Sequence, residues 1–190
     1  ENKSAEKKEF SLTDAEKKQL LHEARQSIKH LFDKTVLSKN EIVSETLQTN
    51  CGAFVTLHEH KKLRGCIGMV VAHKPLIDTV REMAVSAARH DYRFQPVTEE
   101  ELDDIEIEIS VLSPLKHIQD IREIIPGVHG IFIQKGRQSG LFLPQVTTET
   151  GWNLEEFLGH CARDKAGIGW DGWKEADIYT FTATVFQEEK

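Results

Sequence analysis

The spacing of apolar residues predicts two amphipathic helices in the first half of the chain. The first lies behind a capping box formed by Thr13 and Glu16 and is expected to end near Asp33. The second follows Pro75, which suits the first turn of a helix because a proline lacks the N–H that would have no partner there. Its apolar face is rich in small alanines, which indicates close packing on a sheet: Leu76, Ile77, Val80, Met83, Ala84, Ala87 and Ala88.

Other segments have the composition and the two-residue period of β-strands. Residues 51–57 and 62–71 flank a polar turn and predict a hairpin. Residues 105–111 alternate strictly between apolar and polar positions, which predicts a strand with one face toward solvent. A second hairpin is expected from residues 130–134 and 141–143. Residues 178–186 predict one last strand.

The rest of the second half is expected to alternate between helix and loop. Asn153 and Glu156 form another capping box, which predicts a helix that ends near Gly167. A Gly- and Trp-rich loop follows to Trp173, and the segment between Pro114 and Pro126 is expected to be an irregular or helical connector. Hairpins with interspersed helices predict the α+β class. We expect a polar, flexible start over residues 1–10 and a single domain over residues 11–190.

Charge and composition narrow the partners and the location. The formal net charge is −7, from 31 acidic and 24 basic residues, so a nucleic-acid backbone would on average be repelled. No run of apolar residues is long enough to span a membrane, and the start of the chain is charged throughout, so we expect a cytoplasmic protein with no membrane partner. The three cysteines lack the spacing of a disulfide framework or a zinc site and are expected to be free.

Cys66 is the most chemically suggestive residue. In an extended strand it shares one face with Arg64 and Gly68, and a neighbouring guanidinium favours the reactive thiolate form of a thiol. Gly65 and Gly68 leave room for a backbone or a ligand to approach. Cys66 is therefore either a nucleophile, redox centre or metal ligand, or a small buried apolar residue of the kind that free cysteines often are.

The remaining candidates are weaker. Cys161 lies on the apolar stripe of its helix and is expected in the core, and Cys51 heads a strand with no better sign of function. His58 and His60 alternate at a hairpin tip, but zinc sites need three or four ligands and the local sequence supplies no third, so no metal site and no cofactor are predicted. The chain lacks the phosphate-binding G-x-x-x-x-G-K-[ST] loop, the G-x-S-x-G elbow and a C-x-x-C pair.

The run Cys51-Gly52-Ala53-Phe54-Val55-Thr56-Leu57 is followed, after a polar turn, by the hexapeptide Leu63-Arg64-Gly65-Cys66-Ile67-Gly68. These stretches, the hexapeptide most specifically, resemble those of the AMMECR family, whose microbial members are called AmmeMemoRadiSam system protein A. Further similar segments include 91–94, 109–112 and 140–146, so the resemblance covers nearly the whole chain from the first helix onward. One departure is Tyr92, where family members often carry proline.

The resemblance implies a two-lobed α+β fold with the hexapeptide near the cleft between the lobes. It also implies two protein partners, a MEMO-like protein and a radical S-adenosylmethionine enzyme. Two hypotheses follow. In the first, the protein is an enzyme component with Cys66 and Arg64 as catalytic residues, while Gly65, Gly68, Arg93 and Gln145 contact a small polar or anionic organic substrate. In the second, it is a ligand-binding or adaptor module in which Cys66 only packs.

Overall fold

The computed structural model describes residues 9–35 and 43–189, which form two compact units. The first consists of Glu1–Ile109 with Phe186–Lys190, and the second is the continuous segment Ser110–Val185. The larger part of the predicted flexible start, residues 1–8, lies outside the described residues.

The first helix, α1 (Asp14–Lys29), begins as its sequence predicts. The Thr13 hydroxyl accepts a hydrogen bond from the Glu16 N–H at 3.2 Å, and the Glu16 carboxylate accepts one from the Thr13 N–H at 2.8 Å. This reciprocal pair satisfies two donors that a helix start leaves open. The helix ends before Asp33, because the chain continues from His30 in turns, and its buried face consists of Leu20, Glu23, Ala24 and Ile28.

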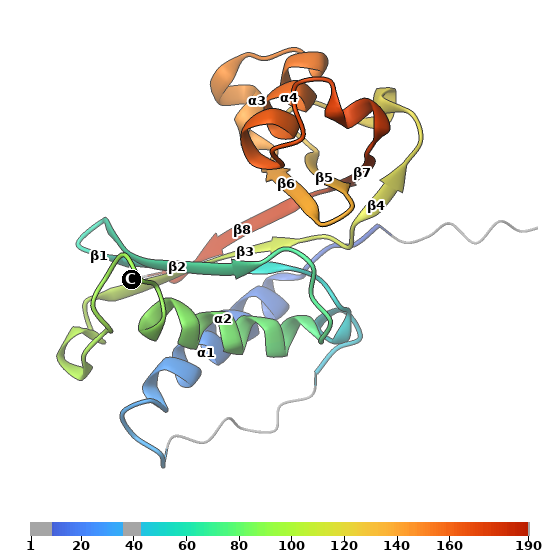
Figure 1. Cartoon of the computed structure of the whole chain (residues 1–190). Helices are drawn as coiled ribbons and strands as arrows, with labels where there is room; N and C mark the ends of the chain where they lie inside the picture. Colours follow the sequence, from blue (N-terminus) through green and yellow to red (C-terminus); the bar gives the residue numbers. More distant parts are fainter. Residues whose placement is uncertain (1–8, 36–42, 190) are drawn as a thin grey trace, which may run out of the picture. The chain divides into compact units, whose positions relative to one another are not determined.

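A four-stranded sheet of order β2-β1-β3-β8 carries the hexapeptide on an edge strand. Its strands are β1 (Ala53–Glu59), β2 (Lys62–Met69), β3 (Ile105–Leu112) and β8 (Ala183–Gln187). Helices α1 and α2 (Leu76–Arg89) lie on the same side of β1 and β2 (Figure 1). That side receives the apolar residues of β1 and β3, and the predicted alternation over residues 105–111 appears as buried isoleucines between half-buried polar residues.

The predicted close packing of α2 on the sheet is confirmed at Gly65. A Cβ atom on Gly65 would lie 2.3 Å from the main-chain oxygen of Ala87, so the helix backbone occupies the space that a side chain would need. Ala84, Ala87 and Ala88 are all buried, and their short side chains permit this approach.

The predicted last strand is in fact two strands, which belong to different sheets. β7 (Asp177–Phe181) and β8 are separated by Thr182. The Thr182 carbonyl accepts from the Ser113 N–H at 2.9 Å, and the Ser113 hydroxyl accepts from the Thr182 N–H at 2.8 Å. The apolar pattern runs through this break without a signal, because β-branched and aromatic residues suit both sheets.

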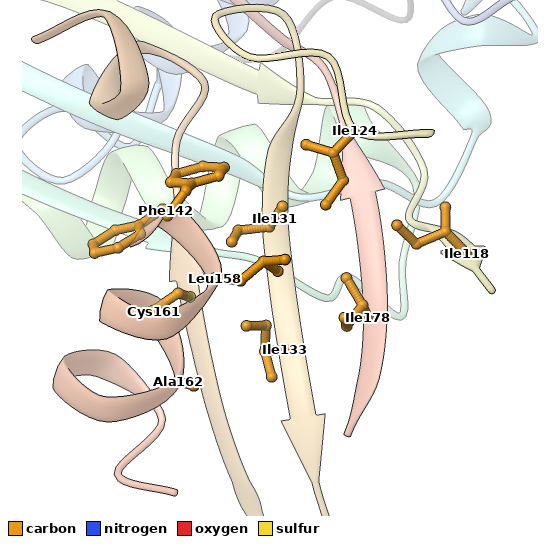
Figure 2. Close-up of a cluster of buried hydrophobic side chains, with 10 residues drawn as sticks. Ile118, Ile124, Ile131, Ile133, Phe142, Leu158, Cys161, Ala162 and Ile178 are labelled. Atoms are coloured by element: carbon orange, nitrogen blue, oxygen red, sulfur yellow. The ribbon is translucent and has the colours of Figure 1, made fainter. Parts of the chain in front are cut away.

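The second unit contains a sheet of order β4-β7-β5-β6, formed by β4 (Lys116–Ile118), β7, β5 (Gly130–Lys135) and β6 (Gln138–Phe142). The pairs β4–β7, β5–β7 and β5–β6 are antiparallel. Helix α4 (Leu154–His160) and the π-helical turn after it, Cys161–Lys165, cover one face of this sheet. Leu158, Cys161 and Ala162 point toward the isoleucines of β5 and β7 (Figure 2).

Two elements of this unit differ from the prediction. The connector after Pro114 contains the short strand β4, whose three residues are too few to show a period. Pro144 is followed by a helix, α3 (Gln145–Thr150), which was not predicted because its sequence is polar and β-branched; Gly151, with φ of 71°, ends it.

The α+β class is confirmed, since both units combine helices with strands. Among the described residues, no helix has the length and apolar character that a membrane span requires.

Candidate functional site

Cys66 lies opposite Thr56 in the β1–β2 hairpin, and the two side chains are in contact. The Thr56 Oγ1 and Cys66 Sγ atoms are 3.1 Å apart, a hydrogen bond in which either atom serves as donor. The Cys66 N–H bonds a side chain outside the sheet and not β1, so the pair is of the type that exchanges no backbone hydrogen bonds, in which side chains come closest. A half-buried sulfur with a hydroxyl partner results.

The turn after α2 binds the main chain of Cys66 at the open edge of β2. The Asp91 carboxylate accepts the Cys66 N–H at 2.9 Å, and Arg93 Nη2 donates to the Cys66 carbonyl at 3.3 Å. Asp91 also accepts from Nε and Nη2 of Arg93, at 2.9 and 2.7 Å. These bonds satisfy the backbone groups that an edge strand would otherwise leave open to pairing.

The charges of Asp91 and Arg93 depend on each other. Asp91 is buried, and the hydrogen bonds from Arg93 hold the pKa of its carboxyl well below the usual range. The bond to Asp91 raises the pKa of Arg93, and an electrostatic interaction with Cys66 adds to this effect. The Arg93 side chain is 44% exposed, so its cation binds the Cys66 carbonyl and is still reached by solvent.

Arg64, the predicted charge partner of Cys66, is held by another group. Its Nε and Nη2 donate to the two carboxylate oxygens of Glu101, at 2.7 and 3.1 Å, and its Nη1 donates to the Gln95 carbonyl at 2.9 Å. This bidentate pair lowers the pKa of Glu101. A catalytic role for Arg64 stays a prediction, and Arg93 is a cation that hydrogen-bonds the main chain of Cys66.

The two glycines of the hexapeptide make room for parts of the protein itself. Gly65 accommodates the Ala87 carbonyl, and a Cβ atom on Gly68 would lie 2.1 Å from the ring of Phe54, its partner across the hairpin. The approach of another backbone, one of the two uses expected of these glycines, is thus observed at Gly65. Their contact with a substrate stays a prediction.

The other two cysteines differ sharply from Cys66. Cys51 is 3% exposed and Cys161 is 0% exposed, and burial raises the pKa of each thiol to about 12. Both are neutral apolar packing groups at physiological pH, and Cys161 lies in the core shown in Figure 2. Of the three free cysteines, Cys66 is therefore the one that is only partly buried.

Gln145 and the tryptophans lie in the second unit. Gln145 is exposed at the start of α3, and its substrate contact stays a prediction. Trp152 stacks on His160 at 3.9 Å between ring centroids, and Trp170 meets the same ring edge-on at 4.9 Å. The loop 167–172 reads Gly-Ile-Gly-Trp-Asp-Gly, the spacing of a dinucleotide-binding motif, but it joins a π-helical turn to a 3-10 turn and lacks the strand–turn–helix setting of that motif.

The first hairpin tip has more potential metal ligands than its sequence indicates. Glu59, His60 and Asp104 each offer a ligand atom within 4.8 Å of the other two, because the fold brings the start of β3 to the turn. His60 and Asp104 are exposed. His58 is not a member of this group, which combines one histidine with two carboxylates.

A hollow of about 910 Å³ lies elsewhere in the first unit, between α1 and residues 186–189. Arg25 is its most strongly held cation, since it binds the Glu188 carboxylate and the carbonyls of Leu102 and Ile105. None of the six predicted site residues lines this hollow.

Comparison with known protein families identifies the family of this chain. The AMMECR1 family model matches residues 21–186. The chain belongs to the AMMECR1 family. An AMMECR1-family chain is therefore expected to share its fold with relatives over nearly its full length.

Relatives of similar length agree with this assignment. A protein of Methanothermobacter thermautotrophicus is 41% identical over 187 residues, which cover 94% of this chain and 97% of the relative. A protein of Methanopyrus kandleri is 39% identical over 190 residues, which cover 94% of this chain and 91% of the relative. The crystal structure of the uncharacterized protein PH0010 from Pyrococcus horikoshii is similar with a TM-score of 0.72 and 37% identity, over 90% of each chain.

Proposed function

We propose that this AMMECR1-family protein is an enzyme component that uses the Cys66 thiol on a small polar or anionic organic substrate. The observation that carries the proposal is the contrast among the three thiols: Cys51 and Cys161 are buried, whereas Cys66 is half-buried and hydrogen-bonded to Thr56. A partly exposed thiol with a hydroxyl and a cation near it has the surroundings of a reactive cysteine. The partly exposed Arg93 suits an anionic group on the substrate.

Partners and location belong to the same proposal. We infer from the family that the protein acts with a MEMO-like protein and a radical S-adenosylmethionine enzyme in the cytoplasm. Free thiols fit a reducing compartment, because glutathione and thioredoxin keep cysteines reduced there.

The experiment measures the rate at which Cys66 reacts with iodoacetamide as the pH is varied. The protein carries Cys51→Ala and Cys161→Ala so that only Cys66 is labelled, and the same chain with Cys66→Ala is the control. We expect rapid labelling of Cys66 in the folded protein, at a rate that rises with pH, and no labelling of the control. Labelling that occurs only after the protein is unfolded would show that Cys66 has a structural role and is not reactive.

A second candidate function is a ligand-binding or adaptor module. It is favoured by Tyr92, an aromatic side chain that is 94% exposed between Asp91 and Arg93. Exposed aromatic residues are enriched where proteins bind one another. Under this alternative Tyr92→Ala weakens capture of the MEMO-like or radical enzyme partner, whereas Cys66→Ala leaves capture unchanged.

A further inference from the structure

We propose that Asp91 is a positioning residue of the Cys66 site, which holds the Cys66 main chain and the Arg93 guanidinium together and thereby sets the charge that faces the thiol. This inference rests on the proposed function, since it concerns how the same thiol is controlled. Asp91 lies in a segment that carries the family resemblance, but it is not among the site residues predicted from the sequence.

The geometry of Asp91 joins three groups through one carboxylate. Oδ2 accepts the Cys66 N–H at 2.9 Å and Arg93 Nη2 at 2.7 Å, and Oδ1 accepts Arg93 Nε at 2.9 Å and Arg93 N–H at 3.2 Å. The same Nη2 reaches the Cys66 carbonyl at 3.3 Å. The peptide groups on both sides of the Cys66 side chain are therefore fixed by one ion pair.

A second Asp-x-Arg segment, Asp120–Arg122, shows which contacts of Asp91 follow from the local sequence and which are particular to the Cys66 site. Asp120 accepts from the Arg122 N–H and Nε at 2.9 and 3.0 Å and also binds Nη2, so the local pattern of Asp91 and Arg93 repeats. The Asp120 side chain is 42% exposed, whereas the Asp91 side chain is 2% exposed. The hydrogen bonds within the Asp-x-Arg segment therefore form from the local sequence. Asp91 differs from Asp120 in being buried against β2 and in binding the Cys66 N–H.

The charges around the thiol come from three elements. The turn after α2 supplies Asp91 and Arg93, β2 supplies Arg64 and the 3-10 turn Glu99–Glu101 supplies Glu101, while β1 contributes the neutral Thr56. Arg64 and Glu101 neutralise each other in a bidentate pair. The charges of Asp91 and Arg93 are therefore the ones expected to control the Cys66 thiolate. The cation favours the thiolate, and the carboxylate disfavours it.

Two substitutions remove one charge each and predict opposite effects. Arg93→Gln leaves the Asp91 carboxylate uncompensated, so the midpoint of Cys66 labelling should rise by about half to one pH unit. Asp91→Asn keeps an acceptor for the Cys66 N–H and leaves Arg93 its bond to the Cys66 carbonyl, but it removes the negative charge, so the midpoint should fall by a similar amount. The ratio of labelling rates with iodoacetate and iodoacetamide should fall in the first variant and rise in the second.

The matched controls are Asp120→Asn and Arg122→Gln, which break the same local pattern away from any cysteine. They should leave both the midpoint and the reagent ratio at the values of the parent. Arg93→Lys retains the charge and should restore most of the midpoint; since Arg93 is 44% exposed, this pair of Arg93 variants decides the question even if Asp91→Asn fails to fold.

The outcomes separate this inference from the proposed function. If Cys66 of the parent is inert in the folded protein, the proposed function fails and the inference fails with it. If Cys66 reacts but the two variants shift the midpoint in the same direction, or not at all, the positioning role of Asp91 is wrong while the reactive thiol stands. Shifts of opposite sign support the inference, because a loss of structure alone would move both variants the same way.

Discussion

At the scale of single residues, two properties stand out. One is the partial exposure of the Cys66 thiol, and the other is the lack of space for a side chain at Gly65. The hexapeptide combines both, since Cys66 is half-buried and its neighbour Gly65 is pressed against a helix. Each property leads to a measurement.

Labelling should find one reactive thiol per folded chain. Because burial raises the pKa of Cys51 and Cys161 to about 12, both stay protonated at pH 8, and their thiolates become available only as the pH rises toward that value. Mass spectrometry after brief treatment of the parent with iodoacetamide at pH 8 should show a single adduct, on Cys66. Three adducts are expected in denaturant, and rapid native labelling of Cys161 would contradict the packing in Figure 2.

Gly65→Ala should destabilise the protein by about 1–3 kcal/mol, because the added methyl would meet the Ala87 carbonyl at 2.3 Å and the backbones of β2 and α2 would have to separate. Urea denaturation measures this change. Gly136→Asn is a suitable control, since nothing lies within 4 Å of a Cβ at Gly136 and asparagine tolerates its φ of 61°. Equal stability of Gly65→Ala and the parent would show that the close contact relaxes easily.

At the scale of elements, the hexapeptide strand is held by the turns that follow α2. The segment 91–95 binds Cys66 and Arg64, and the 3-10 turn that follows presents Glu101 to Arg64. Strand β2 is thus joined to two later turns through charge-assisted hydrogen bonds, which are stronger than neutral ones.

The Arg64–Glu101 contact should make part of the stability depend on pH. The bond to Arg64 lowers the pKa of Glu101 below 4.5, so the folded state binds its proton less readily than the unfolded state. The stabilisation is therefore fully present above pH 4.5 and is lost as the pH falls toward the lowered value. The stability difference between the parent and Glu101→Gln, measured by thermal unfolding, should shrink on acidification from pH 7 to pH 3.

Glu99→Gln on the same turn is the control for that measurement, because Glu99 is exposed. Its difference from the parent should be small and should change little over the same range. A Glu101→Gln difference that stays constant with pH would show that the contact acts through packing and not through charge.

At the scale of the whole molecule, the second unit is a continuous insertion between two strands of the first sheet. β3 leads into it and β8 follows it, and these strands are neighbours. Ser113 and Thr182 bind each other's main chain at the base of the insertion. The loop that a deletion must close is therefore short.

Replacement of residues 114–181 by a short Gly-Ser linker should leave a folded first unit. The reason is that β3 and β8 would form a hairpin while α1 and α2 keep their buried faces on the sheet. Circular dichroism should retain a helical signal with a cooperative thermal transition. A chain that is unfolded after this replacement would show that the first unit depends on the second.

The sequence by itself determined the elements whose patterns are local. Capping boxes at Thr13 and Asn153 and the alternation over residues 105–111 predicted helices and a strand that the structure contains, because such signals lie within a few residues of one another. The hexapeptide and the other similar segments pointed to the family, and the glycines of the hexapeptide indicated a close approach, which the backbone of α2 makes at Gly65.

Only the tertiary structure decided which distant groups meet. The last strand divides at Thr182 because its two halves pair with strands of different sheets. Arg64 binds Glu101 and Asp91 binds Cys66, and both contacts join residues far apart along the chain. The Asp-x-Arg pattern occurs at both 91–93 and 120–122, yet one copy is buried on a cysteine and the other is exposed. The local sequence determines the hydrogen bonds within the turn. Packing against the edge of a sheet determines which residue outside the turn the aspartate binds, and for Asp91 this residue is Cys66.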